Sequence, residues 1–213
     1  MPRKPRTMSK RATASGSTEA AAGLSGLLRE VRACRLCEAQ LPLGPRPVVR
    51  MAPSARLLIV GQAPGTKVHE TGIPWNDPSG DRLRDWLQLD RDSFYDERRV
   101  AIMPMGFCYP GREARGGDKP PRPECAPAWH PPLLAALPEV ELTLLVGLYA
   151  QGRYLGKRRK ANLTETVRAW RDYLPGHFAL PHPSWRNTAW LRRNPWFEAE
   201  LLPELRARVQ ALL

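Results

Sequence analysis

Four cysteines in the sequence have a spacing that is typical of a metal or cluster site. Cys34 and Cys37 form a Cys-x-x-Cys pair, and Cys108 and Cys125 follow at wider intervals. Four thiolates are the ligands of many structural zinc sites and of [4Fe–4S] clusters. Four unrelated thiols would also account for these residues, because a Cys-x-x-Cys pair alone is a weak signal. The segment 109–124 is rich in Pro and Gly, which favours a loop around a bound cofactor.

Two further motifs carry groups that could act on a bound ligand. The run Gly-Gln-Ala-Pro-Gly occupies residues 61–65, and its glycines allow the backbone N–H groups to approach a ligand closely. It matches neither the dinucleotide-binding GxGxxG pattern nor a phosphate-binding P-loop. The run His-Pro-Ser-Trp-Arg-Asn occupies residues 182–187 and combines an imidazole with groups that bind phosphate or stack on bases. Each motif alone would also fit an ordinary turn or a structural histidine.

The pattern of apolar residues indicates which elements position these motifs. Short apolar runs alternate with helical patterns and predict four strands, at residues 57–60, 100–105, 142–146 and 177–180. Strands that alternate with helices favour a parallel sheet that is covered on both faces. The predicted fold class is therefore α/β, with three α/β/α layers and a four-stranded parallel sheet. Both motifs follow a predicted strand directly, and ligands bind at the carboxyl ends of such strands.

Length and charge limit the organisation of the chain. Its 213 residues suit one domain, and 33 Lys and Arg against 21 Asp and Glu give a net charge of +12, which favours a polyanionic partner. Residues 1–20 are basic and rich in Ser, Thr and Ala, so we expect a disordered tail there and a single domain over residues 21–213. No apolar run is long enough to predict a membrane span. We expect a cytoplasmic, nucleoid-associated monomer of the bacterial type, with an organellar location as the alternative.

Part of the positive charge is concentrated in one run of the predicted domain. This run consists of four consecutive basic residues: Lys157, Arg158, Arg159 and Lys160. Such a run either contacts the phosphates of a nucleic acid or forms a solvated basic face. Both interpretations stay open at the level of the sequence.

Taken in order, these motifs resemble the uracil-DNA glycosylase superfamily, and most closely its iron–sulfur branch, family 4. The resemblance rests on GQAPG after the first strand, HPS after the last strand and the cysteine spacing, and it covers about residues 27–212. It implies a monofunctional glycosylase that hydrolyses the N-glycosidic bond of uracil in DNA during base excision repair. It also implies that Cys34, Cys37, Cys108 and Cys125 hold a [4Fe–4S] cluster, with zinc as the alternative.

The resemblance assigns roles to individual residues. His182 would stabilise the leaving base, and Trp75 would stack on the base that has been flipped out of the helix. The backbone N–H of Ala63 would assist His182. Asp77 or His69 would orient the attacking water, although Asp77 also stands where a helix-capping residue is expected. The residues after His182 would contact DNA and open its base stack: Ser184, Trp185, Arg186 and Asn187.

Three departures from the family pattern concern the recognition of the base. Gln62 replaces the usual Glu of the branch, residues 66–70 replace an acidic stretch, and Pro104 occupies the place of the Asn that reads the base edge. Gln62 is then the side-chain amide best suited to bind the base. Two alternatives follow: a glycosylase for another deaminated base, such as hypoxanthine or xanthine, or a non-catalytic DNA-binding module that retains the cluster.

Overall fold

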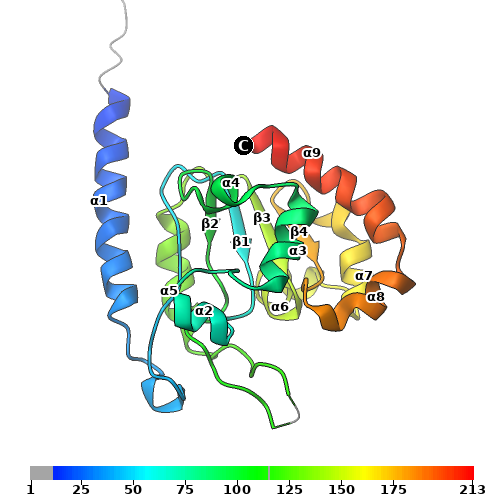
Figure 1. The fold of residues 1–213 in the computed structure, drawn as a ribbon. Helices are drawn as coiled ribbons and strands as arrows, with labels where there is room; N and C mark the ends of the chain where they lie inside the picture. The colour runs from blue at the N-terminus through cyan, green and yellow to red at the C-terminus, as the bar shows by residue number, and fades with distance from the viewer. Residues whose placement is uncertain (1–11, 115) are drawn as a thin grey trace, which may run out of the picture.

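A computed structural model of the protein describes residues 12–114 and 116–213. Its centre is a sheet of four strands: β1 (Leu57–Val60), β2 (Val100–Ile102), β3 (Leu142–Val146) and β4 (His177–Leu180). The strand order is β2-β1-β3-β4 and every pairing is parallel, which confirms the predicted fold class (Figure 1). The second strand ends at Ile102 instead of residue 105, because Pro104 has no amide hydrogen to donate to a neighbouring strand.

Helices cover both faces of this sheet. They are α1 (Ala12–Arg32), α2 (Thr66–Thr71), α3 (Pro78–Leu87), α4 (Arg91–Tyr95), α5 (Cys125–Ala135), α6 (Leu148–Leu155), α7 (Leu163–Arg168), α8 (Thr188–Arg193) and α9 (Leu202–Leu212). Alternate residues of each strand enter two separate cores, since successive strand side chains point to opposite faces. Leu58 packs with α1, α5 and α6, whereas Leu57 and Ile59 pack with α3, α7 and α9 (Figure 1).

The first helix begins inside the segment that was predicted to be a tail. Helix α1 spans Ala12–Arg32, and the prediction of a tail over residues 1–20 and a single domain over residues 21–213 stays a prediction. The remaining part of the predicted tail, residues 1–11, lies outside the described residues. Within the described chain, there is no helix of the length and apolarity that a membrane crossing requires.

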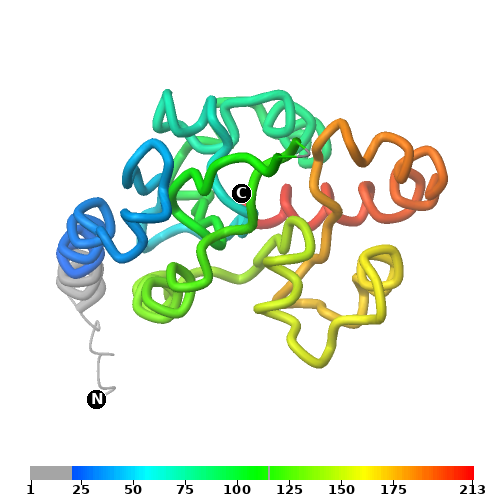
Figure 2. Tube along the Cα trace, turned by 90° about the horizontal axis from the view of Figure 1, so that it is seen from below, coloured from blue at the N-terminus to red at the C-terminus, as the bar shows by residue number. Residues whose placement is uncertain are grey.

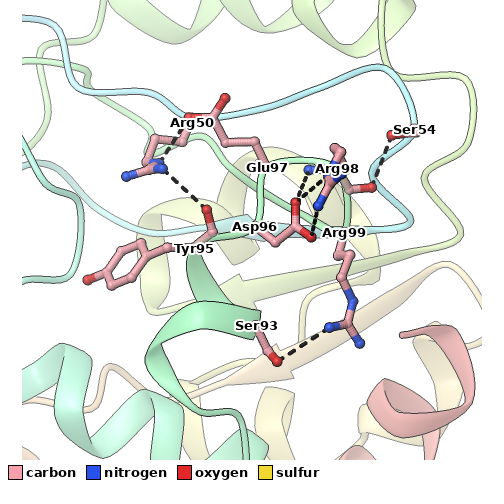
Figure 3. A network of polar contacts seen from close by, with 8 residues as sticks. All are labelled: Arg50, Ser54, Ser93, Tyr95, Asp96, Glu97, Arg98 and Arg99. Carbon is pink, nitrogen blue, oxygen red and sulfur yellow. Dashed lines mark hydrogen bonds and ion pairs between the residues drawn. The ribbon is translucent and has the colours of Figure 1, made fainter.

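A polar network ties the segment before β1 to the segment before β2 at the amino ends of the strands (Figure 3). Arg50 bonds to the carbonyl of Tyr95 at 3.2 Å and pairs with Glu97 at 3.1 Å. Ser54 donates to the carbonyl of Arg98 at 3.1 Å. The side chains at this end of the sheet are therefore engaged in structural contacts. The loops at the opposite end are the ones to consider for a functional site.

The loops at the carboxyl ends of the strands converge on one another. Figure 2 shows this end of the molecule, where the loop after β2 crosses toward the segment that follows β4. The loop after β1 contains residues 61–65 and leads into α2, and the segment after β4 contains residues 182–187. The two motifs of the sequence analysis are thus brought to the same edge of the sheet, because all four strands run in one direction.

Candidate active site

A cavity of about 430 Å³ lies at the carboxyl ends of the strands, within the range of small-molecule sites. The loops after β1, β2 and β4 all contribute to its walls. The structure brings together most of the predicted site residues as lining residues: Gln62, Ala63, Trp75, Asp77, His182, Ser184, Trp185, Arg186 and Asn187. A nucleobase-sized ligand fits such a space.

His182 is held in one tautomer by its own loop. The backbone N–H of Ser184 donates to Nδ1 of His182 at 3.2 Å, and Asn187 donates to the His182 carbonyl at 2.7 Å. Burial lowers the pKa of His182, while the charge of Asp77 raises it. The neutral imidazole therefore carries its proton on Nε2, because Nδ1 acts as an acceptor. His182 is a hydrogen-bond donor with a defined orientation.

Trp75 lies next to His182 in the cavity wall, with ring centroids 5.6 Å apart and ring planes tilted by 35°. Its backbone has a left-handed φ of 56°, which is unfavourable for a bulky residue unless the surroundings enforce it. Arg84 donates to the Trp75 carbonyl at 3.2 Å, and the ring lies so close to Gly61 that a Cβ there would meet Cζ2 at 2.7 Å. Arg84 is buried on α3 and fixes the backbone of Trp75, the predicted stacking residue. Its position in the sequence carries no signal of this role.

Asp77 and His69, the two candidates for orienting water, have different environments. Asp77 lines the cavity, and its Oδ1 also caps α3 by accepting from the Gly80 N–H at 2.8 Å. His69 is buried on α2 with its ring 6.0 Å from that of Tyr109, and it is outside the set of described residues that line the cavity. Burial is the main cause that lowers the pKa of His69. Of the two candidates, Asp77 is the one that faces the cavity.

The wall that would read the base is built around Gln62 and Pro104. Nε2 of Gln62 donates to the Lys119 carbonyl in a long hydrogen bond of 3.4 Å, which directs Oε1 away from that carbonyl. Pro104 lines the cavity, but its carbonyl accepts from Nε2 of His130 at 3.0 Å. Tyr154 donates to Nδ1 of the same imidazole, since burial lowers the pKa of His130 to about 4 and keeps it neutral. The Pro104 carbonyl is therefore engaged in a buried network.

Comparison with known proteins agrees with this geometry. The family model of the uracil DNA glycosylase superfamily matches residues 49–206. The chain belongs to this superfamily. A DNA glycosylase is a hydrolase that acts on DNA, so DNA is the substrate class of this chain. A solved structure of wild-type SMUG2 from Pedobacter heparinus is similar, with a TM-score of 0.45 and 14% identity over 88% of this chain and 97% of that chain.

A hairpin in the loop after β2 adds residues to the cavity that no motif of the sequence predicts. Arg112 and Asp118 pair as an isolated antiparallel bridge, and the Glu113 N–H donates to the Gly117 carbonyl at 2.8 Å. Gly117 has a φ of 102°, which favours glycine. Arg112, Gly117 and Asp118 all line the cavity. The Gly-Gly-Asp sequence is a turn signal, whereas the composition of the segment predicts only a cofactor loop.

The residues predicted to contact DNA lie in two places. Trp185 is 76% exposed beside the cavity, and the Arg186 guanidinium lies over its ring at 5.6 Å from the centroid. The basic run at residues 157–160 is separate from the described cavity lining. Within this run, Lys160 pairs with Asp172 at 2.8 Å and Arg158 donates to the Asp172 carbonyl at 2.6 Å. Two of its four cations are thus partly engaged within the protein.

The four cysteines, far apart in sequence, line one small cavity at the start of α5: Cys34, Cys37, Cys108 and Cys125. Two N–H groups point at their sulfurs, from Trp129 to Cys34 and from Phe107 to Cys125, each at 3.3 Å. Burial raises the pKa of Cys108 to about 11 and that of Cys125 to about 12. Among the described residues, no three His, Cys, Asp or Glu are arranged to hold a single metal ion.

Proposed function

We propose that this protein is a monofunctional uracil-DNA glycosylase of base excision repair. One observation carries the proposal: His182 and Trp75 lie side by side in the wall of a base-sized cavity, and Nδ1 of His182 accepts a hydrogen bond, which leaves Nε2–H as the donor. A glycosylase must extrude a base, stack it and stabilise the negative charge that the base acquires. These two residues provide the stacking face and the donor.

The reaction follows from the positions of these groups. The flipped uracil stacks on Trp75, an interaction worth about 1–3 kcal/mol per base. As the N-glycosidic bond breaks, negative charge develops on the base, and His182 donates a hydrogen bond to O2. The backbone N–H of Ala63, also at the cavity wall, assists. Water then attacks the sugar carbon to leave an abasic site.

Recognition of uracil rests on Gln62 in this proposal. Its Oε1 accepts from uracil N3–H, and the second hydrogen of Nε2 is free to meet O4. Hypoxanthine presents the same donor and acceptor side by side at N1–H and O6. Pro104 lines the cavity but has no side-chain amide that could distinguish the two bases, so hypoxanthine is the second candidate substrate. Xanthine is included in the same test.

Single-turnover excision assays test the proposal. Oligonucleotides with uracil, hypoxanthine or xanthine are incubated with the protein, and abasic sites are then cleaved with alkali. We expect cleavage at uracil, and a loss of about 10²–10³-fold for His182→Ala with unchanged affinity for undamaged DNA. Excision of hypoxanthine or xanthine alone would reassign the substrate. Binding without excision of any base would establish the non-catalytic alternative.

The four cysteines are proposed to hold a [4Fe–4S] cluster. Support comes from the shared cavity and from the N–H groups that point at two sulfurs. When bound, the cluster would brace the two cysteine loops. Anaerobically purified protein should contain about four irons per chain. One zinc and no iron would contradict this.

A further inference from the structure

The hairpin after β2 carries a carboxylate into the cavity. Asp118 lines the cavity opposite the GQAPG motif, and a Cβ on Gly65 would lie 3.4 Å from its Oδ2. The carboxylate therefore lies within van der Waals reach of the backbone at Gly65. An acidic group thus reaches the first motif from a segment far away in the sequence.

The backbone next to Asp118 has contacts with both motifs. Lys119 donates its backbone N–H to the Gly111 carbonyl at 2.9 Å, and its own carbonyl accepts from Gln62 of the first motif at 3.4 Å. On the other side, the Arg186 guanidinium lies so near Gly117 that a Cβ there would meet Nη1 at 2.3 Å. The backbone on either side of Asp118 is thus connected to both motifs.

The carboxylate of Asp118 is available for chemistry. Asp118 lines the cavity with its side chain exposed, whereas Oδ1 of Asp77 is used to cap α3. Burial raises the pKa of Asp118, Arg112 and Arg186 lower it, and Asp77 raises it. Asp118 is exposed overall, but partial desolvation of its carboxylate makes it a stronger base than a fully solvated aspartate, and the two arginines favour its ionised form.

We propose that Asp118 is a catalytic carboxylate that holds the attacking water and accepts its proton. This inference rests on the proposed glycosylase function. The bond between C1′ and the base nitrogen breaks, and its electron pair leaves with the base. The water oxygen forms the new bond to C1′, and one water proton passes to Asp118. The products are the abasic sugar and the free base, which is neutral once it takes up that proton.

The charge of Asp118 favours this role over recognition of the base. The leaving base becomes anionic, so a carboxylate beside it would oppose bond breaking. The sugar becomes cationic, and a carboxylate beside it lowers the energy of that state. Arg112 and Arg186 flank Asp118 and are suited to bind the phosphates on either side of the flipped nucleotide. This end of the cavity is thus the sugar end.

The test compares Asp118→Asn with Glu113→Gln, an acid-to-amide change at an exposed site on the same hairpin. Asp118→Asn should lower the rate of single-turnover excision about 10²–10⁴-fold. Its affinity for DNA that contains 2′-fluoro-2′-deoxyuridine, a nucleotide that resists cleavage, should equal that of the wild type. Glu113→Gln should change neither the rate nor the binding. Asp118→Glu, which keeps a carboxylate, should recover part of the rate. Thermal unfolding of each variant reports whether the fold is intact.

The pH profile separates catalysis from a structural role. The ionised carboxylate is the active form, so the wild-type rate should fall as the pH drops through the pKa of Asp118. The charged groups that act on Asp118 are Arg112, Arg186 and Asp77. Asp118→Asn should lose the decrease in rate at low pH, and Asp77→Asn should retain it.

Three results for Asp118→Asn would each overturn the inference. They are a wild-type rate of excision, a changed choice of base at an unchanged rate, and weaker DNA binding that explains the whole decrease in rate. If the wild type excises no base from the panel, the proposed function itself fails and the inference fails with it.

Discussion

At the scale of single residues, hydrogen bonds decide which atom of each side chain is available. Ser184 occupies Nδ1 of His182, so the proton of the neutral ring lies on Nε2. His130 has the opposite role, because both of its ring nitrogens are used inside the protein, by Tyr154 and by the Pro104 carbonyl. His130 is therefore a structural residue, and His182 is the proposed hydrogen-bond donor to the base.

His130 should make stability depend on pH. Its folded-state pKa of about 4 lies below the ordinary value of 6.5, so the unfolded chain binds the proton more readily between these values. The contribution is present above about pH 6.5 and is lost as the pH falls toward 4, by at most about 3 kcal/mol. Denaturant unfolding at pH 7 and pH 4.5 should show a smaller decrease for His130→Gln than for the wild type. Equal decreases would contradict this.

At the scale of elements, helix α3 positions the stacking residue as well as packing on the sheet. Asp77 caps its first turn, Arg84 bonds to the Trp75 carbonyl, and Tyr95 of α4 donates to the Pro74 carbonyl at 2.8 Å. The loop before α3 also passes directly over Gly80. The unusual backbone of Trp75 is therefore maintained by the helix that follows it.

Gly80→Ala should disturb this arrangement. A Cβ at position 80 would lie 1.7 Å from the Trp75 carbonyl oxygen, so the backbone of the loop must move. We expect a decrease of about 1–3 kcal/mol in the free energy of unfolding, together with weaker binding of DNA that contains a flipped base. Gly176→Ala is the matched control, because no atom lies within 4 Å of its Cβ. A Gly80→Ala protein with normal stability and binding would refute this explanation.

At the scale of the whole molecule, the carboxyl end of the sheet is built for a polyanion and the amino end is closed by its own ion pairs. Arg112, Arg186 and the exposed Trp185 surround the cavity. The network around Asp96 and Arg98 lies at the other end (Figure 3). In the proposed function, these two arginines are the cations nearest to the nucleotide that enters the cavity.

The basic run should contribute a part of DNA affinity that does not depend on sequence. Neutralising Lys157, Arg158, Arg159 and Lys160 together should weaken binding to all duplexes alike. The log–log salt dependence should flatten by about 0.9 for each phosphate that the variant no longer binds. Arg98→Gln, at the opposite end of the sheet, is the control and should leave the slope unchanged. An unchanged slope in the quadruple variant would make this run a solvated face.

The pattern of apolar residues and short motifs along the chain was enough to predict the fold class and the superfamily. The apolar runs marked the four strands, because a strand buried on both faces reads as continuous hydrophobic sequence. Their parallel direction then placed GQAPG and His182 at one edge, as the cavity confirms. The family followed from these motifs and is confirmed by the match over residues 49–206.

Only the tertiary structure decided which polar residues share the cavity. Asp118 reaches Gly65 through a hairpin from a distant loop, and Arg84 reaches Trp75 from inside a helix. His69, although close to the first motif in sequence, turns toward Tyr109 instead. Local periodicity predicts whether a residue lies on a strand or a helix. It contains no information about contacts between loops, because those depend on how the completed sheet and its helices pack.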